Sequence, residues 1–299
     1  MKSRYKIAKR VLIFWTIFIG IGAVAGAVGM FSDTSGAAMK MDAMLPYFQK
    51  LPFAEYVFQD FLFPGIALLI VNGLTNLTAA VLLFMNKKIG IYLGGIFGVT
   101  LMLWICIQFY IFPFNFMSTS FFIFGFLQAV TGYITLVFYK QETYFVNEKC
   151  YSNIGTNHKR LVVYFSRMGY VKEKAFEEAD RTGAEIYEVR STELTEGTKG
   201  FWWCGRYGMH RWEMPIETIN TNLSSYDHVT ICSPIWVFNL CAPIRSFCKQ
   251  ASGQIKEVDY ILVHHNKSDY VNAADEMDSL LDIKHVGLKS FCCREGKFK

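Results

Sequence analysis

Four long apolar stretches alternate with short polar segments in the first half of the chain. They run over residues 11–31, 61–85, 89–112 and 121–138. A helix needs about 20 apolar residues to cross the hydrocarbon core of a bilayer. We therefore predict four membrane-spanning helices in an α-helical transmembrane domain of residues 1–140. The loop after the first helix should carry a short interfacial helix near residues 45–58.

Basic residues predict how these helices are oriented. Five Lys and Arg residues lie between positions 2 and 10, Lys87 and Lys88 separate the second and third stretches, and Lys140 follows the fourth. Because positive charges stay on the cytoplasmic side, we expect a multi-pass plasma-membrane protein whose N-terminus and C-terminal domain are cytoplasmic. The alternative for the first stretch is a signal peptide cleaved near residues 23–25, but the apolar run is long for one.

Small and polar residues within the spans indicate how the helices pack. Gly90, Gly94 and Gly98 recur every four residues, which favours close packing against another helix. Asn72 and Asn76 lie one turn apart on the second span, and polar groups at membrane depth need partners. Two interpretations of the asparagine pair stay open. The pair lines a cavity for a quinone or another substrate, or it hydrogen-bonds neighbouring helices.

The pattern changes after a polar linker of residues 141–159. Short runs rich in β-branched and aromatic residues now alternate with helical periods. Strands are predicted at residues 161–165, 184–189, 227–232, 258–263 and 284–292, and helices at 172–181, 242–251 and 271–281. This alternation predicts an α/β domain of residues 160–299 with a doubly wound, five-stranded parallel sheet. No helical period follows the last strand, so we expect membrane or partner contacts in place of a final helix.

Composition supports this division and excludes some functions. Hydrophobic residues make up 52% of the chain, which is high for a soluble protein of this length. The net charge of +5 is concentrated near the predicted membrane edges, so it indicates orientation rather than nucleic-acid binding. None of the eight cysteines forms a Cys-x-x-Cys pair or a Cys/His cluster with zinc spacing. We predict free cytosolic thiols and no metal site.

Two predicted strands end in sequences that suit a ligand. The first ends in Ser166, Arg167, Met168 and Gly169, which lead directly into a helix. The N-terminus of a helix after a glycine turn is a common phosphate site. The third strand ends in Ser233, Pro234, Ile235 and Trp236, which we interpret as a proline-stiffened turn that presents a flat ring. If the two strands are neighbours, both sequences face one crevice at the switch point of the sheet.

These residues resemble the flavodoxin family. Residues 163–169 are similar to its first-strand phosphate loop, and residues 232–236 with 242–247 are similar to the segment beside its flavin ring. Residues 264–266 match its third flavin-contacting loop more loosely. The resemblance covers residues 159–294, which is under half of the chain.

The resemblance implies FMN as the cofactor. It assigns the phosphate to Ser166, Arg167, Met168, Gly169, Tyr170 and Val171, the flavin ring to Ser233, Pro234, Ile235, Trp236, Val237, Phe238 and Asn239, and the polar edge of that ring to His265. The family usually has Thr at the positions of Met168 and Val171, so two hydroxyl donors are missing here. Lys172 would compensate as a point charge, and we expect FMN binding to be weakened rather than abolished.

An aromatic segment at residues 200–212 has no counterpart in the predicted pattern. Its Trp and Arg content favours an anchor on the membrane, over the flavin or in a partner. The alternative is that Trp202 or Trp203 covers the sheet in place of a crossover helix. Cys204 and His210 have no spacing that indicates catalysis.

The sequence thus favours a membrane-tethered, FMN-dependent oxidoreductase or electron-transfer component. It would pass electrons to a partner reductase, a quinone or a small acceptor at the cytoplasmic face, with the lipid membrane as a further partner. The first alternative is a flavin-free flavodoxin-fold adaptor or regulatory module anchored in the membrane. A second alternative, suggested by Asn72 and Asn76, is a small transporter with a cytosolic redox sensor.

Overall fold

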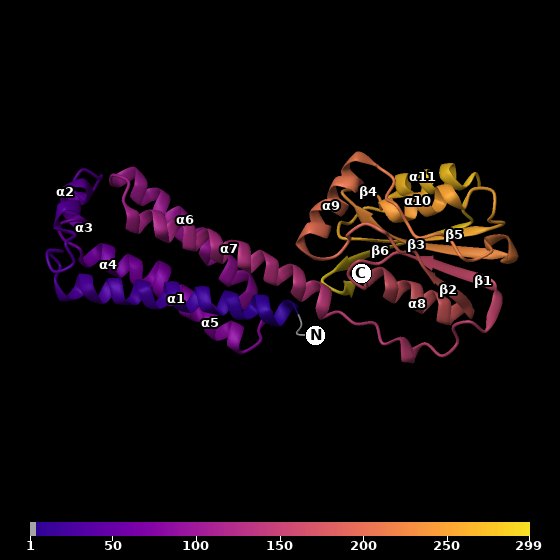
Figure 1. Ribbon diagram of the computed structural model, residues 1–299, viewed down its shortest axis with the longest axis horizontal. Coiled ribbons are helices and arrows are strands. Elements are labelled where there is room, and N and C mark those ends of the chain that lie inside the picture. The colour runs from indigo at the N-terminus through magenta and orange to yellow at the C-terminus, as the bar shows by residue number, and fades with distance from the viewer. Residues whose placement is uncertain (1–3) are drawn as a thin grey trace. The chain divides into compact units, whose positions relative to one another are not determined.

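The computed structural model describes residues 4–299. The chain forms two compact units, Met1–Tyr139 and Lys140–Lys299. Figure 1 shows that the first is built from helices and the second from a sheet with helices on both faces. Helix α7 ends at Glu142 and strand β1 begins at Asn157, so both regular elements extend into the predicted linker of residues 141–159.

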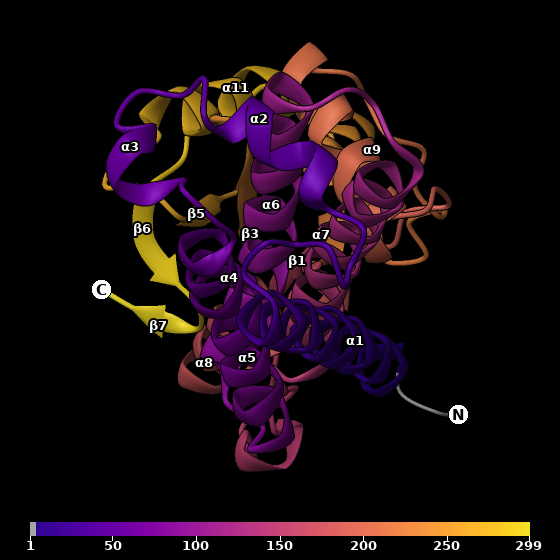
Figure 2. The ribbon, with the colours of Figure 1, turned by 90° about the vertical axis from the view of Figure 1, so that its left-hand side faces the viewer.

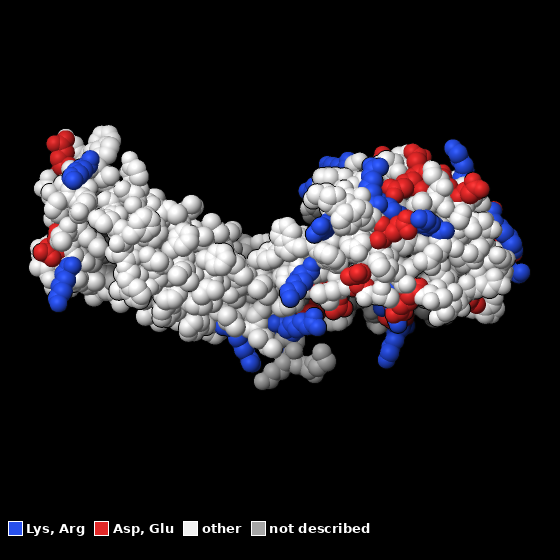
Figure 3. Space-filling view, turned by 45° about the horizontal axis from the view of Figure 1, so that its top comes forward, with Lys and Arg blue, Asp and Glu red and all other residues white. Residues whose placement is uncertain are grey.

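Four helices of the N-terminal unit are long and apolar enough to cross a membrane. They are α1 (Arg4–Ser32), the continuous helix Leu62–Phe84, α6 (Lys88–Ile111) and α7 (Phe116–Glu142). The second of these consists of α4 (Leu62–Leu68), a π-helical turn η2 (Leu69–Leu74) and α5 (Thr75–Phe84). Figure 3 shows a long surface of this unit without charge, with Lys, Arg, Asp and Glu at its ends.

Close backbone contact holds the helices together. The three regularly spaced glycines of α6 are all buried, as the packing interpretation predicts. A Cβ atom at Gly98 would lie 2.5 Å from the backbone nitrogen of Ala129 on α7, so only glycine permits this approach. Small residues that let backbones meet are the usual basis of helix packing in lipid.

The loop between α1 and α4 carries short helices instead of the single interfacial helix predicted at residues 45–58. They are η1 (Asp42–Met44), α2 (Leu45–Phe48) and α3 (Ala54–Val57). Phe53 has a φ of +62°, a left-handed conformation that interrupts the helix between α2 and α3. Figure 2, which looks at that end of the unit, shows α2 and α3 in the loop beyond α4.

The C-terminal unit contains a seven-stranded sheet rather than the five-stranded one predicted. The strands are β1 (Asn157–Tyr164), β2 (Ala184–Glu188), β3 (His228–Trp236), β4 (Asn239–Leu240), β5 (Val258–His264), β6 (Gly287–Arg294) and β7 (Lys297–Phe298). The parallel part has the order β2-β1-β3-β5-β6 and matches the five predicted strands. Two-residue turns add β4 antiparallel to β3 and β7 antiparallel to β6. Each added strand has two residues, too few to leave a periodic signal in the sequence.

Helices cover both faces of the sheet, as predicted for a doubly wound fold. The helices are α8 (Tyr170–Thr182), α9 (Gly197–His210), α10 (Ala242–Gln250) and α11 (Val271–Leu281), with 3-10 turns η3 (Glu148–Cys150) and η4 (Leu223–Ser225). Alternate residues of β1 serve the two faces: Leu161 and Val163 pack with α10 and α11, whereas Val162 and Tyr164 pack with α8. This alternation follows from the two-residue period of a strand.

Residues 143–156 form a covering segment over the α8 face. The Tyr151 ring lies 5.6 Å from that of Phe176 on α8, and the Asn153 side chain donates a 2.6 Å hydrogen bond to the backbone oxygen of Asp180. Val146 and Ile154 pack against the same core. The chain before β1 therefore covers part of the sheet face on which α8 lies.

Candidate functional site

Three loops meet at the carboxyl edge of the sheet. They follow β1, β3 and β5, and these strands are direct neighbours because β3 pairs in parallel with both β1 and β5. The sequence left open whether the first and third strands adjoin, and the pairing confirms that they do. Figure 1 shows the alternation of strands and helices that brings these loops together. This edge, where strand order reverses on either side of β1, is where open parallel sheets bind ligands.

The first loop has the backbone geometry of an anion site. The Gly169 N–H donates a 3.1 Å hydrogen bond to Oγ of Ser166, and Gly169 has a φ of +88°, which favours glycine. Helix α8 begins at the next residue without a side-chain cap. The first N–H groups of a helix have no partner within the helix, and its dipole favours negative charge there.

Side chains contribute less to this loop than the sequence suggests. Val171 is buried and packs in the core, so its side chain does not face the loop. Arg167 donates hydrogen bonds of 2.6 and 2.8 Å to the backbone oxygens of Thr195 and Gly197, and these fasten the start of α9. Lys172, which we expected to compensate for the missing hydroxyl groups, instead pairs with Glu148 at 2.5 Å. The partner of Lys172 is thus an acidic residue of the covering segment.

Tyr144 lies directly against this loop, and the sequence analysis missed it. A Cβ atom at Gly169 would lie 2.9 Å from Cδ1 of Tyr144, and the Tyr144 ring packs edge-on against Tyr170 at 4.6 Å. The same ring touches the β6–β7 turn at Gly296. A tyrosine in a polar segment carries no periodic signal, so only the folded chain reveals this contact.

The second predicted site sequence is the end of a strand rather than a turn. Pro234 still pairs with β5, while Ile235 and Trp236 pair with β4. The Ser233 side chain is buried, and its hydroxyl donates to the backbone oxygen of Pro234 at 3.0 Å. Trp236 is partly buried, and its ring meets Phe165 edge-on at 5.5 Å, which joins the first and second loops. The ring therefore braces the site instead of standing exposed at its edge.

The turn that connects β3 and β4 offers the exposed apolar surface. Val237 and Phe238 both have positive φ values, +47° and +64°, and their side chains are 40% and 63% exposed. A β-branched residue in this conformation is strained. Such strain gathers at functional sites when the surroundings hold it in place. Asn239 provides that hold, because its amide donates to the Gly208 oxygen at 3.1 Å and accepts from Arg211 at 3.0 Å.

The third loop contributes an exposed histidine. His265 is exposed at the end of β5, and its backbone oxygen accepts a hydrogen bond from Sγ of Cys292 at 3.3 Å. Its neighbour His264 is buried, with Nε2 2.7 Å from Oγ of Ser290 and its ring 5.0 Å from Tyr270. The two histidines therefore differ: His264 is structural, and His265 is the one available to a ligand.

The aromatic segment forms a helix, so Trp202 and Trp203 do not replace one. Helix α9 buries its small residues, including Cys204 and Gly208, and Gly208 packs against Trp236. Its large side chains Phe201, Trp202, Trp203 and Met209 are exposed, and Trp212 just beyond its end is exposed as well. The buried face of this helix contains three glycines in place of apolar side chains, so the sequence shows no helical period of hydrophobic residues there. Burial raises the pKa of the Cys204 thiol to about 11, so it carries no thiolate near neutral pH.

Metal and disulfide chemistry is not indicated by residues 4–299. No cluster of three or more His, Cys, Asp or Glu side chains in that range could hold a metal ion. All eight cysteines are free thiols. Neighbouring Cys292 and Cys293 lie on the same strand and differ in exposure, as adjacent strand residues do.

No family model and no curated protein matches the chain. Solved structures similar to it include a protein classed as a flavoprotein from Bacteroides eggerthii (23% identity, TM-score 0.40, 45% of this chain and 88% of that chain). A flavoprotein in complex with FMN from Lactobacillus acidophilus has 20% identity and a TM-score of 0.38, over 45% of this chain and 93% of that one. A third structure, a protein classed as a flavoprotein from Bacteroides uniformis, has 21% identity and a TM-score of 0.41, over 46% of this chain and 94% of that one.

Because these identities and scores are low, the fold assignment rests on the strand order. The order β2-β1-β3-β5-β6, with β1 and β3 adjacent at the switch point, is that of flavodoxin-like sheets. The C-terminal unit is a flavodoxin-like domain.

Proposed function

We propose that the flavodoxin-like domain binds FMN across its three carboxyl-edge loops. The observation that carries the proposal is the uncapped N-terminus of α8 behind Gly169, one strand away from an exposed, strained apolar turn. A helix N-terminus suits a phosphate, and an apolar surface beside it suits a flat ring. The similar flavoprotein from Lactobacillus acidophilus, which is described in complex with FMN, supports this choice of ligand.

Each loop has a separate part in this proposal. The backbone N–H groups of residues 167–171 and the Ser166 hydroxyl hold the phosphate. The Val171 side chain faces the core, so a hydroxyl group at this position would not reach the phosphate. Val237 and Phe238 cover the ring, while Trp236 packs against Phe165 and joins the first and second loops. His265 approaches the polar edge of the ring. Bound FMN would supply reversible electron transfer, and the protein would tune its electronics.

The proposed role is electron transfer at a membrane. The four long apolar helices would tether the domain to the lipid bilayer. The electrons would pass to a partner reductase, a quinone or a small acceptor. The exposed positions of Val237 and Phe238 support this role because an acceptor must come close to the flavin.

A flavin-free adaptor is the second candidate, and one contact favours it. The Tyr144 ring packs on Gly169 and Tyr170, at the place where a phosphate would approach. If this contact is permanent, the loop binds no phosphate and the domain serves as a binding module. The two candidates therefore differ in a single measurable property, which is whether the protein takes up FMN.

The test is made on the full-length protein purified in detergent. We expect a yellow protein that releases FMN on denaturation, identified by mass spectrometry. Gly169→Ala should weaken FMN binding at least tenfold, because alanine rarely adopts the φ of +88° and a Cβ there would lie 2.9 Å from the Tyr144 ring, so the loop must change shape.

The matched control is Gly253→Ala. Gly253 has a similar φ of +72°, but a Cβ there meets nothing within 4 Å. It should cost about 1–2 kcal/mol of stability through backbone strain alone and leave FMN affinity unchanged. A colourless protein that takes up no FMN at micromolar concentrations would reject the flavin function in favour of the adaptor.

A further inference from the structure

The N-terminal unit contains a partly open cavity that the flavin function does not use. It has a volume of about 510 Å³ and lies where the α1–α4 loop and the α6–α7 turn close over the helices. Its walls come mainly from Met, Leu, Ile and aromatic side chains. Pockets for small molecules typically have this size and an apolar lining with a few polar groups.

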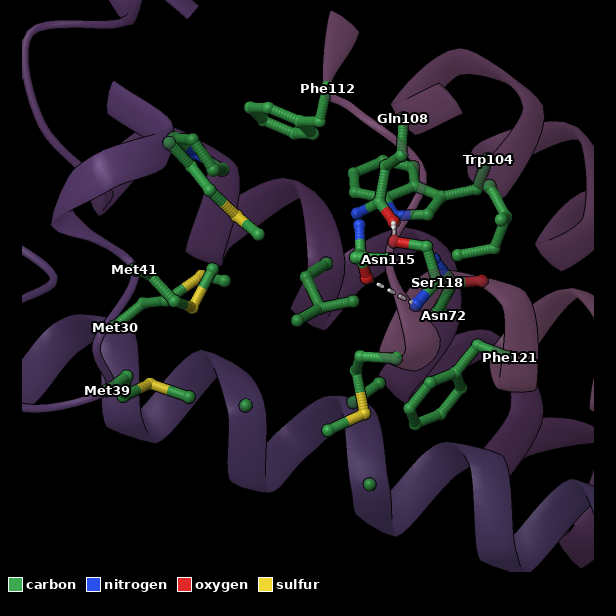
Figure 4. Close-up of a pocket in the computed structure, with 18 of the residues that line it drawn as sticks. Met30, Met39, Met41, Asn72, Trp104, Gln108, Phe112, Asn115, Ser118 and Phe121 are labelled. Carbon is green, nitrogen blue, oxygen red and sulfur yellow. Dashed lines mark hydrogen bonds between the residues drawn. The ribbon is translucent and has the colours of Figure 1, made fainter. Parts of the chain in front are cut away.

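The polar groups of the cavity gather on one wall. Figure 4 shows Asn72, Trp104, Gln108, Asn115 and Ser118 together, with Met30, Met39 and Met41 on the other side. Three of the five polar residues satisfy one another: the Ser118 hydroxyl donates to Oε1 of Gln108 at 3.2 Å, and its backbone N–H donates to Oδ1 of Asn115 at 2.8 Å. This network leaves Asn72 and Trp104 to be accounted for.

Asn72 and Trp104 have polar atoms without partners. The Asn72 side chain is 1% exposed, and neither its Nδ2 nor its Oδ1 has a hydrogen-bond partner among residues 4–299. Nε1 of Trp104 is also buried and unpartnered within that range. Each such group costs about 1–3 kcal/mol, and membrane interiors offer no water to reduce this cost. Two of these three unpartnered atoms, Nδ2 of Asn72 and Nε1 of Trp104, are donors, and they indicate a ligand that accepts hydrogen bonds.

Asn76, one turn along the same helix, has the same side chain as Asn72 but has hydrogen-bond partners. Asn76 accepts a 2.7 Å hydrogen bond from Gln128 and donates a 2.9 Å bond to the backbone oxygen of Asn72. Asn76 therefore hydrogen-bonds a neighbouring helix, which is one of the two interpretations that the sequence left open. Asn72 instead lies in the π-helical turn η2 and lines the cavity. Such turns are rare and occur frequently at functional sites.

The lining also constrains the charge and shape of a ligand. Lys40 is the only ionisable residue among the described residues that line the cavity, and it is exposed rather than buried. An uncharged ligand is therefore favoured, because nothing in the interior would neutralise a buried charge. Aromatic side chains from several segments surround the space, including Phe48, Phe61, Phe112 and Phe121. Rings of this kind pack well against another flat ring.

We propose that this cavity binds an uncharged, flat, conjugated ring bearing carbonyl groups, a quinone-type molecule taken from the bilayer. One carbonyl oxygen accepts from Nδ2 of Asn72 or Nε1 of Trp104, and the ring lies among the aromatic and methionine side chains. Methionine is flexible and fills gaps, so the far wall adapts to ring substituents. The site is independent of the proposed flavin site, and no electron transfer between the two is implied.

The experiment compares two probes that differ only in their carbonyl groups. The probes are 2,3-dimethyl-1,4-naphthoquinone and 2,3-dimethylnaphthalene. Both free positions of the quinone ring carry methyl groups, so the quinone does not alkylate thiols. Each probe is titrated calorimetrically into the full-length protein in detergent. We expect the quinone to bind at least tenfold more tightly than the hydrocarbon. Asn72→Leu and Trp104→Phe should each weaken quinone binding about tenfold, the value of one lost hydrogen bond, and leave hydrocarbon binding unchanged.

Three controls make the result decisive. Asn72→Leu should keep or raise the unfolding temperature, since it removes unsatisfied polar atoms. Trp15→Phe removes an indole on α1 that does not line the cavity, and it should change neither affinity. Gly169→Ala should bind the quinone as the wild type does, which separates this site from the flavin site. Equal affinity for the two probes, or unchanged quinone binding in both cavity variants, would overturn the proposal.

Discussion

At the scale of single residues, buried polar groups in this protein are distinguished by their partners. Asn72 and Asn76 have the same side chain on the same helix, yet one is unsatisfied and the other joins two helices. The Ser233 hydroxyl donates its hydrogen bond to the backbone oxygen of Pro234, although its position in the sequence suggests a ligand contact. Residue type and spacing therefore identify candidates, and the number of available partners decides their role.

Glu178 shows the same principle for a charge. Its side chain is almost fully buried on α8, and it pairs with Arg181 and, at 2.9 Å, with Lys289 on β6. Burial by itself would raise its pKa, but hydrogen bonds from Arg181 and Lys289 hold the pKa below its ordinary value of 4.5. Because the folded-state pKa is depressed, this stabilisation is present above the ordinary value and is lost as pH falls through the folded-state pKa.

Glu178→Gln should therefore destabilise the protein by roughly 1–2 kcal/mol at neutral pH, and by much less in acid. Thermal unfolding followed by intrinsic fluorescence measures this difference. Glu177→Gln is the matched control, since the Glu177 side chain is exposed in its pair with Lys174 and should change stability by less than about 0.5 kcal/mol. A destabilisation of Glu178→Gln that is equally large in acid would contradict the assignment.

At the scale of elements, two short hairpins extend the sheet and serve different purposes. The β6–β7 turn consists of Glu295 and Gly296, both at positive φ, and only Gly296 adopts this conformation without strain. The β3–β4 turn has the same two-residue form but carries Val237 and Phe238, which are poorly suited to it. The β3–β4 turn thus has two strained residues where the β6–β7 turn has one, and it lies at the edge where the ligand is proposed to bind.

Replacing Val237 by Asn and Phe238 by Gly should separate stability from function. Asn-Gly is the preferred pair for such a turn, so the double variant should gain about 1–2 kcal/mol of stability. It should also lose at least tenfold in FMN affinity, because the apolar cover of the ring is gone. Unfolding temperature and flavin titration measure the two effects.

The β6–β7 hairpin provides the control for this experiment. Glu295→Asn places the same preferred residue in a turn away from β3. It should raise stability without affecting FMN affinity. If the β3–β4 variant keeps its FMN affinity, Val237 and Phe238 do not cover the flavin.

At the scale of the whole molecule, charge is distributed unevenly along the chain. The apolar spans of the first unit have Lys and Arg residues near one set of ends, at Lys9, Lys87, Lys88 and Lys140. The α6–α7 turn at residues 112–115 contains no charge. This asymmetry is the pattern that sets orientation in membranes.

Reporter fusions test the predicted orientation. A reporter after Lys299 and one inserted after Asn86 should both behave as cytoplasmic, because basic residues stay inside. A reporter inserted after Phe114 should behave as external, which provides the opposite control. An external signal from the fusion after Lys299 would overturn the four-span arrangement.

The pattern of the sequence predicted most of the regular elements. The four long helices and the five parallel strands were predicted because apolar periodicity reports directly which residues avoid water. Helix α9 was missed because glycines form its buried face and aromatic residues its exposed one. Strands β4 and β7 were missed because two residues are too few to show a period.

The candidate site was predictable only in part. The first loop was recognised from Ser166 and Gly169, whose spacing reflects a local turn, and its adjacency to β3 is confirmed. The roles of Lys172 and Trp236 were not predictable, since each depends on a neighbour that is distant in the sequence, Glu148 for one and Phe165 for the other. Tyr144 could not be found at all, because it lies in a segment without regular structure.

The sequence by itself thus determined that the chain has two parts. The first is apolar enough to span a membrane, and the second, in which strand and helix patterns alternate, folds as an α/β domain. It did so because hydrophobic periodicity specifies how much of each element is buried. The tertiary structure alone decided what each buried or exposed group meets. It placed Tyr144 over Gly169, satisfied Asn76, and left Asn72 and Trp104 facing a cavity, because such contacts join residues whose separation along the chain leaves no local pattern.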